Sequence, residues 1–454
     1  MTAPAEVAAA RTVVRRAPGK LFVAGEYAVV DAGNPAILVA VDRYITVTVT
    51  GTPDAPDAPD APDAPDAPDA PDAPDAPDSL GGPGSFSGPG APGNLGGSGT
   101  PSGPGTAHTP RHPHSPGPFT TDRSPAPGVT ISSDLTPRPT AWRWHEGRLV
   151  LHGPGDGAQA RAVLAHVVGA VETVGALLAE RGLPVPELGI AVSSRLHEGG
   201  RKYGLGSSGA VTVAAVDAVA AFCGVKLSAG ERYRLAMLAS ARIDPKGSGG
   251  DLAASAWGGW ILYRAPDRAF VLDLARRVGI ARTLAAPWPG HEVRRLPPPA
   301  GLRLEVGWTG EPVSTASQVA GLQRRGGRPD TAARRRYVRA SNRLVEAAAG
   351  ALEAGEDAGL LAQIRTAAAE LARLDEAVGL GIFTPRLRRL CEAAEAVGAA
   401  AKPSGAGGGD CGIALLDAAA SRHICQVRRH WTAAGVHPLP VRPAAQRPER
   451  TPQP

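Results

Sequence analysis

The amino-acid sequence predicts an α+β protein divided into two domains. Segments with the two-residue alternation of strands are interspersed with longer segments of helical periodicity. A proline run, Pro297–Pro299, separates two such regions and is typical of a linker. At 454 residues the chain is long enough for more than one hydrophobic core. We therefore expect an N-terminal domain over residues 12–298, a C-terminal domain over residues 299–441 and a disordered tail over residues 442–454.

The N-terminal domain should begin with strands. Residues 36–41 are continuously apolar, and residues 44–50 alternate between apolar side chains and threonine, as a half-buried strand does. Further strands are expected over residues 129–133, 142–144, 188–193 and 257–263, the first two of them paired. Helices are expected over residues 159–182, which should be amphipathic, and over 207–222 and 229–242.

The C-terminal domain should also mix strands with helices. Its expected elements are a strand over residues 302–306, helices over 330–354, 356–377 and 384–398, and strands on both sides of residues 402–410.

Residues 52–127 are predicted to be a disordered insertion in a surface hairpin. Pro53 to Asp78 is a Pro-Asp-Ala repeat, and sequence rich in Gly, Pro and Ser follows. Such a segment has too little apolar surface to offset the entropy lost on ordering. Its composition suits an inert repeat expansion better than an interaction arm. The insertion also carries three histidines with metal-like spacing, for which we expect no metal site: His108, His112 and His114.

Composition narrows the class of protein. The net charge of +5 includes nine aspartates of the repeat, so the rest of the chain is strongly basic. In the absence of a zinc-finger or RNA-stacking motif, this charge favours anionic small-molecule substrates over nucleic acid. The four cysteines show no CxxC pairing, which fits a reducing cytoplasm. Neither a signal peptide nor a run long enough to cross a membrane is expected.

Glycine-rich segments that carry hydroxyl or charged residues recur at residues 17–20, 204–209, 247–251 and 402–410. A backbone without Cβ atoms can wrap its N–H groups around a phosphate. Of 48 basic residues only five are lysine, and four of these lie in or beside the segments: Lys20, Lys202, Lys246 and Lys402. A lysine retained where arginine is the usual cation indicates a need for a compact ammonium, or chance. Together these features predict a phosphoryl-transfer enzyme.

The segment Gly204-Leu-Gly-Ser-Ser-Gly209 is expected to follow a strand and to open a helix. Backbone amides at the positive end of that helix would face an anionic ligand. The segment lacks the Gly-Lys-Ser/Thr ending of a Walker loop and the acidic partner of a Rossmann fingerprint. The alternative is a tight turn capped by serine.

These segments resemble the three motifs of the GHMP kinase family, in the family's order. The first is Arg16-Ala-Pro-Gly-Lys20 with Gly25-Glu-Tyr27, the second is residues 204–209, and the third is residues 402–410. The resemblance covers about residues 15–440. It implies a two-domain GHMP kinase architecture, with an N-terminal domain like ribosomal protein S5 and a ferredoxin-like C-terminal domain. ATP and Mg²⁺ are the implied cofactors, in a monomer or homodimer.

Other details resemble the phosphomevalonate kinase branch of this family. They are Tyr27, where mevalonate kinases have histidine, and the segments 203–211, 249–253 and 307–310. This resemblance implies direct in-line transfer from ATP to (R)-5-phosphomevalonate, giving 5-diphosphomevalonate in the mevalonate pathway. The alternatives are mevalonate kinase or another GHMP kinase with an alcohol acceptor, a related decarboxylase, and a catalytically silent nucleotide-binding scaffold.

The resemblance also implies residue roles. The catalytic pair would be Lys20 and Asp251, and Ser208 would contact Mg²⁺. Mevalonate kinases place a metal-binding glutamate where this chain has Ser240, so the completion of the metal shell is left open. The expected nucleotide-binding residues are Gly204, Leu205, Gly206, Ser207, Ser208 and Gly209. The expected substrate-binding residues are Lys20, Lys202, Ser404, Gly405, Gly407 and Gly408.

The chemistry of the acceptor suggests a particular role for Asp251. A phosphomonoester has a second pKa near ~6 and is already mostly dianionic at neutral pH. Our hypothesis is that Asp251 orients Lys20 and balances charge instead of abstracting a proton. Arg201 and His197 are either acceptor-phosphate ligands or solvated loop residues, and Lys246 is expected on the surface. The tryptophans Trp257 and Trp260 are expected in the core, not as a base-stacking platform.

Overall fold

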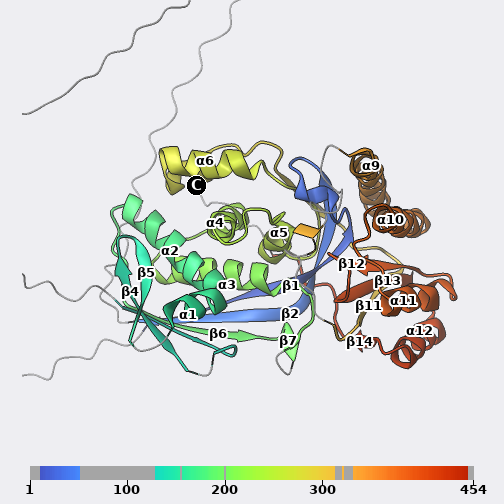
Figure 1. Cartoon of the computed structure of the whole chain (residues 1–454), viewed down its shortest axis with the longest axis horizontal. Helices are drawn as coiled ribbons and strands as arrows, with labels where there is room; N and C mark the ends of the chain where they lie inside the picture. Colours follow the sequence, from blue (N-terminus) through green and yellow to red (C-terminus); the bar gives the residue numbers. More distant parts are fainter. Residues whose placement is uncertain are drawn as a thin grey trace, which may run out of the picture. The chain divides into compact units, whose positions relative to one another are not determined.

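The computed structural model describes residues 11–51, 128–136, 138–153, 156–198, 201–311, 318, 320–321 and 331–447. These residues fall within one compact unit. They form a larger and a smaller β-sheet, each packed against helices, and Pro297–Pro299 lies in the stretch that joins them (Figure 1). The predicted α+β class is confirmed.

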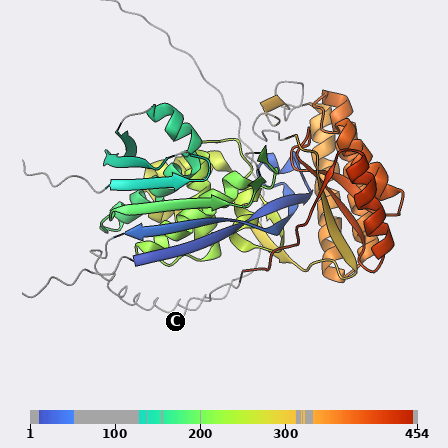
Figure 2. The ribbon, with the colours of Figure 1, turned by 90° about the horizontal axis from the view of Figure 1, so that it is seen from below.

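The larger sheet is organised around β2 (Pro35–Gly51). The first part of this long strand pairs with β9 and the last part with β6, while β1 runs antiparallel along its other edge. The strand order is β10-β9-β2-β6-β3-β4-β5, with β1 on β2 (Figure 2). The remaining bounds are β1 Arg11–Ala24, β3 Gly128–Ser133, β4 Thr140–His145, β5 Arg148–His152, β6 Leu188–Ser194, β9 Trp260–Arg264 and β10 Glu292–Leu296. A short ribbon pairs β7 His197–Glu198 with β8 Arg201–Lys202.

Helices α3 (Ser207–Phe222) and α5 (Gly250–Trp257) pack directly on β1 and β2. Helix α4 (Ala229–Ala241) lies against both and begins with a capping box formed by Ser228 and Glu231. The expected core positions of Trp257 and Trp260 are confirmed, because both side chains are buried. The other helices here are η1 Ala28–Val30, α1 Gly157–Val163, α2 Ala165–Glu180, α6 Arg268–Val278 and α7 Ile280–Ala285.

The single amphipathic helix expected over residues 159–182 is wrong in two respects. The chain bends by 88° at Leu164, which separates α1 from α2. Helix α2 is buried almost continuously from Val167 to Leu178, because it packs between α3, α4 and α7. Across the described ranges, no single helix is long and apolar enough to cross a membrane; only the bent α1–α2 pair meets that test of length and composition.

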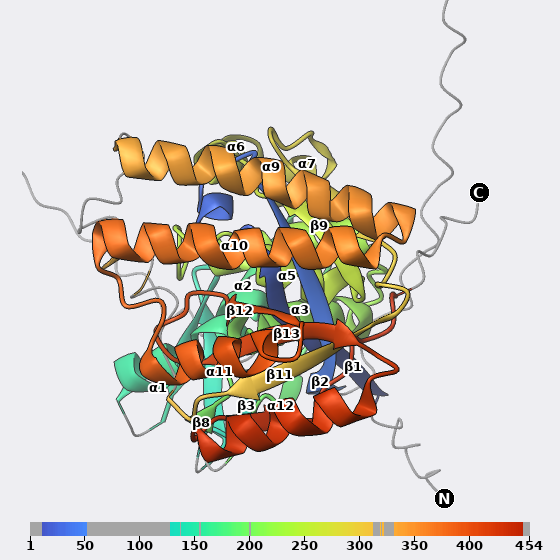
Figure 3. The ribbon, with the colours of Figure 1, turned by 90° about the vertical axis from the view of Figure 1, so that its right-hand side faces the viewer.

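The smaller sheet has the antiparallel order β12-β13-β11-β14. With its connecting helices, this order is that of a ferredoxin-like domain, as expected. Helices α9 and α10 lie side by side, and α11 and α12 pack on the sheet (Figure 3). The bounds are β11 Leu302–Trp308, α9 Ala332–Ala354, α10 Asp357–Val378, α11 Pro385–Glu395, β12 Ala400–Ser404, β13 Cys411–Asp417, α12 Ser421–Ala433 and β14 His437–Leu439.

The strands that flank the insertion do not form the expected hairpin. Strand β2 ends at Gly51 and β3 begins at Gly128, but both pair with β6, which lies between them. The pairing of β3 with β4 is as predicted. The insertion, with its three histidines, lies outside the described residues.

The sequence predicted a tail that is disordered from residue 442 onward, and this prediction is wrong for residues 442–447. The Asp42 N–H donates to the Arg442 carbonyl at 2.9 Å, and the Ala444 N–H donates to the Ala40 carbonyl at 2.8 Å. Residues 442–447 therefore return to the larger sheet, because their backbone groups find partners on β2. Residues 448–454 lie outside the described part of the chain.

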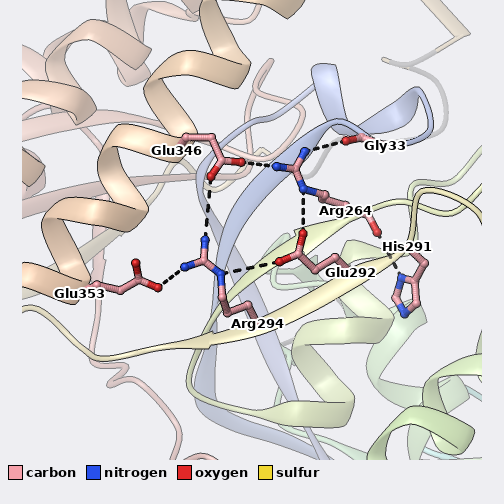
Figure 4. A network of polar contacts seen from close by, with 7 residues as sticks. All are labelled: Gly33, Arg264, His291, Glu292, Arg294, Glu346 and Glu353. Carbon is pink, nitrogen blue, oxygen red and sulfur yellow. Dashed lines mark hydrogen bonds and ion pairs between the residues drawn. The ribbon is translucent and has the colours of Figure 1, made fainter. Parts of the chain in front are cut away.

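A network of ion pairs joins β9 and β10 to α9 (Figure 4). Arg264 contacts Glu292 at 2.9 Å and Glu346, and its guanidinium also donates to the Gly33 carbonyl at 2.9 Å. Arg294 contacts the same two glutamates and Glu353. These side chains are 29–44% exposed, so salt should screen the network and its contribution to stability should be small.

His291 should make the stability of the fold depend on pH. Burial lowers the pKa of His291 to about 4 from its usual 6.5. Because the folded pKa is the lower one, the unfolded chain takes up the proton first as the pH falls, and stability is lost between about pH 6.5 and pH 4. A shift of this size corresponds to up to about 3 kcal/mol. In urea unfolding from pH 7 to pH 4, His291→Phe should lose stability less steeply than wild type. Equal slopes would contradict this.

Candidate active site

The glycine-rich segments converge on one cavity of about 650 Å³. The segment at residues 17–20 contributes Lys20, that at 204–209 contributes Gly206 and Ser208, that at 247–251 contributes Asp251, and the third motif at 402–410 contributes Ser404. These segments come from β1, the start of α3, the start of α5 and the end of β12, so both halves of the chain build the cavity.

Lys20 lies within an otherwise apolar, buried stretch of β1 and is only 8% exposed. Its backbone N–H donates to the Leu205 carbonyl at 2.8 Å, which ties the first segment to the second. Its ammonium lies 5.2 Å from the centre of the Phe22 ring. A Cβ at Gly19 would lie 2.8 Å from that same Leu205 carbonyl, so glycine permits this close approach.

Asp251 lies in the first turn of α5, which begins after Gly249 in the left-handed region at φ 76°. A Cβ at Gly206 would lie 2.9 Å from Lys20 Cε and 3.5 Å from Asp251 Cβ. A Cβ at Gly209 would lie 2.5 Å from Asp251 Oδ2. The Lys20 and Asp251 side chains therefore both lie against the second segment, with glycine at the closest points.

The second segment has the geometry of an anion cradle. Gly204 and Gly206 adopt left-handed φ angles of 78° and 76°, and α3 begins directly after them. Ser207 and Ser208, in the first turn of α3, line the cavity. The Leu205 side chain packs into the core and does not line the cavity. Leu205 contributes to the site only through its backbone carbonyl, which accepts the hydrogen bond from the Lys20 N–H.

The third segment reaches the cavity with only part of its predicted residues. Ser404 Oγ accepts from the Phe22 N–H at 2.9 Å and donates to the Phe22 carbonyl at 3.0 Å, which joins β12 to β1. A Cβ at Gly405 would lie 3.8 Å from Lys20 Nζ. Gly407 and Gly408 instead lie against the loop at Ile382, so the structure does not bring them into the cavity.

Three lysines line the cavity: Lys20, Lys202 and Lys246. Lys246 is exposed as expected, yet it lines this wall. Arg201 does not line it, and His197 lies in an adjoining pocket of about 80 Å³, with Nε2 3.6 Å from Asp134. Positive charge at the cavity therefore comes from lysine, in agreement with the sparing use of lysine in the sequence.

Lys402, the fourth lysine of the glycine-rich segments, has a different role. It is fully buried and forms an ion pair with Glu26, which is 2% exposed. Its ammonium also donates to the Pro403 carbonyl at 2.7 Å. The ammonium is therefore committed to Glu26, and Lys402 does not line the cavity.

Sequence reasoning missed several cavity residues: Glu26, Tyr27, His166, Asp244 and Asp410. Glu26, Tyr27 and Asp410 belong to the quoted motifs, but nothing in the sequence shows which motif residues line the cavity and which pack behind it. Asp410 adopts φ 44°, and its carboxyl group packs against Gly204. His166 gave no signal, because it belongs to the apolar helix α2.

His166 reaches the second segment through Thr212. The Thr212 hydroxyl donates its one proton to the Ser208 carbonyl at 2.8 Å, so it accepts from His166 Nδ1 at 3.2 Å. Nε2 is then the acceptor nitrogen of the ring. Burial lowers the pKa of His166, as does nearby Lys202, while Asp251 and Asp244 oppose the shift.

Comparison with known proteins identifies the family. Residues 165–259 match the GHMP kinases N terminal domain, and residues 347–433 match the GHMP kinases C terminal domain. The chain belongs to the GHMP kinase family, as its motifs predicted. Within that family it is similar to the phosphomevalonate kinase of Streptomyces sp. (strain CL190), with 59% identity over 436 residues, 96% of this chain and 98% of that protein.

Solved structures show the same fold. The Lin0012 protein of Listeria innocua has a TM-score of 0.72 and 25% identity, covering 96% of this chain and 99% of that one. The Streptococcus pneumoniae phosphomevalonate kinase, in complex with phosphomevalonate and AMPPNP, has a TM-score of 0.68 and 22% identity, covering 95% and 99%.

Proposed function

We propose that this protein is an ATP-dependent kinase that phosphorylates (R)-5-phosphomevalonate to 5-diphosphomevalonate in the mevalonate pathway of isoprenoid biosynthesis. The observation that carries the proposal is the placement of the Lys20 and Asp251 side chains together against Gly206 in one cavity. The 59% identity to a phosphomevalonate kinase over nearly the whole chain supports the choice of acceptor. The protein is expected to be cytoplasmic and either a monomer or a homodimer.

Each group of cavity residues would have a separate role in binding or transfer. Amides of residues 204–209 and the start of α3 would hold the ATP phosphates. Lys20 would lie between the donor γ-phosphate and the acceptor phosphate and stabilise the charge of the transition state. Lys202, Ser404 and Gly405, which also line the cavity, would face the acceptor. The phosphoryl group would pass directly and in line from ATP to the acceptor phosphate, with no covalent phosphoenzyme.

The cavity fits Mg²⁺ in the manner of kinase sites, where the metal takes one or two protein oxygens and completes its shell with phosphates and water. Ser208 would hold the ion, and Asp244 lines the cavity beside Ser240, whose carbonyl accepts from the Asp244 N–H at 2.9 Å. Over the described ranges, no cluster of three or more His, Cys, Asp or Glu would hold a metal without such phosphates. When bound, Mg²⁺ neutralises charge on the transferring phosphoryl group.

The acceptor is tested by ADP release in a coupled assay with phosphomevalonate, mevalonate, homoserine and galactose. The proposal expects turnover with phosphomevalonate and at most trace turnover with the three alcohols. Turnover with mevalonate alone would replace the proposal by mevalonate kinase activity. ADP release with none of the four, while nucleotide still binds, would favour a catalytically silent nucleotide-binding protein.

A further inference from the structure

Two buried tyrosines lie behind the turn that leads into α5. The Tyr263 hydroxyl, on β9, donates to the Ser248 carbonyl at 2.6 Å. The Tyr233 hydroxyl, on α4, lies 2.8 Å from the Tyr263 hydroxyl. Both side chains are 0% exposed, so no substrate reaches them.

The direction of these hydrogen bonds is determined. A carbonyl oxygen only accepts, so Tyr263 gives its single hydroxyl proton to Ser248. Tyr233 must then donate to Tyr263. The hydrogen bonds therefore all run in one direction, from Tyr233 on α4 to Tyr263 on β9 and on to the Ser248 carbonyl of the turn. The Tyr263 hydroxyl proton is used only for the Ser248 carbonyl.

Besides the Tyr263 hydroxyl, two backbone donors hold the turn at the end of this hydrogen-bonded chain: Gly250 N–H donates to Ser248 Oγ at 3.3 Å, and Gly247 N–H donates to the Asp244 carbonyl at 3.3 Å. Ser248 lines the cavity, and Gly249 adopts a left-handed φ of 76° before α5 begins. A Cβ at Gly249 would overlap the end of the Met237 side chain, at 2.0 Å. Asp251 follows two residues later, so any shift of the turn moves its carboxylate relative to Lys20.

The tyrosines themselves are held firmly. The His291 ring stacks on Tyr233 at 4.7 Å with an interplanar angle of 7°. Trp257 and Trp288 also pack on the Tyr233 ring, at 5.5 Å and 6.1 Å. Each of these neighbours is itself at least half-buried, so the packing restricts movement of the Tyr233 ring. The Tyr233 hydroxyl is thereby held in place beside the Tyr263 hydroxyl.

We propose that Tyr263, supported by Tyr233, is a positioning residue for Asp251. Its hydrogen bond to the Ser248 carbonyl fixes the position of the Ser248–Gly249 turn. That turn fixes where α5 begins, and thereby the distance between the Asp251 carboxylate and the Lys20 ammonium. The kinetic part of this inference rests on the proposed function, and its structural part does not.

The kinetic test uses Tyr263→Phe, Tyr233→Phe and the double variant in the full chain. Tyr263→Phe should lower kcat at least tenfold, with KM for ATP and phosphomevalonate within twofold of wild type. Tyr233→Phe should lower kcat only two- to threefold, because Tyr263 still bonds to Ser248. The double variant should match Tyr263→Phe alone, since both act through one carbonyl. Tyr44→Phe, which removes a hydroxyl from a half-buried residue of β2, is the control.

Hydrogen exchange supplies a readout that needs no acceptor. In Tyr263→Phe the backbone amides of α5 should exchange at least tenfold faster than in wild type, while those of α3 should not change. Unchanged exchange in α5, or a lowered Tm with kcat unaffected, would overturn the inference. If wild-type enzyme fails to turn over phosphomevalonate, the proposed function falls, and the exchange of α5 still decides the role of Tyr263.

Discussion

Replacing Lys20 by methionine is expected to lower kcat by roughly 10³-fold or more, the size of effect seen when a charge-stabilising group is removed from a phosphoryl-transfer site. Methionine keeps the apolar stem that β1 buries, so the fold should survive and Tm should change little. Lys20→Arg should not restore activity, because the glycines at 206 and 405 leave room for a narrow ammonium stem. Steady-state ADP release measures both variants.

Lys226→Met is the matched control for this experiment. Lys226 is the one lysine of the sequence outside the glycine-rich segments, and its side chain is exposed. Its replacement should leave kcat and KM within twofold of wild type. If the Lys20→Met enzyme keeps a tenth or more of the wild-type kcat, Lys20 does not stabilise the transition state.

Asp251→Asn separates orientation from proton abstraction in the same assay. If Asp251 orients Lys20, the variant should retain measurable turnover, with a pH–rate profile of the same shape as that of wild type. Complete loss at every pH, with substrate binding and the position of Lys20 unchanged, would contradict an orienting role.

Lys402→Met is expected to destabilise the protein by roughly 3–5 kcal/mol, because it leaves the Glu26 carboxylate buried without its partner. Urea unfolding measures this loss. The double variant Lys402→Met/Glu26→Leu should recover most of it, since both charges are then gone. A loss below about 1 kcal/mol in the single variant would show that Glu26 finds water or another donor, and that the pair does not anchor the third segment.

The sequence was informative about the site where chemistry limits the choice of residue. Glycine beside a phosphate and lysine beside a developing charge are hard to replace, so Lys20, Gly206 and Ser208 were predicted and lie together. The roles assigned to them remain predictions. The two sheets also followed from strand periodicity, because half-buried strands show their pattern locally.

Other features depend on contacts between distant segments, which periodicity does not encode. Helix α5 was not predicted; it begins in the glycine-rich segment at 247–251, where Tyr263 and Met237 pack against the turn. Helix α2 was expected to be amphipathic, but neighbours bury it on most sides. Lys402 was noted only for its place in a glycine-rich segment, and the fold alone reveals its partner Glu26.

The most direct test of the account is a crystal structure of the protein with AMPPNP, Mg²⁺ and phosphomevalonate. We expect the γ-phosphate against Gly206, the acceptor phosphate near Lys202 and Ser404, and the Lys20 ammonium in contact with both phosphates. A nucleotide whose terminal phosphate lies in another cavity, with Lys20 and Asp251 touching neither substrate, would contradict it.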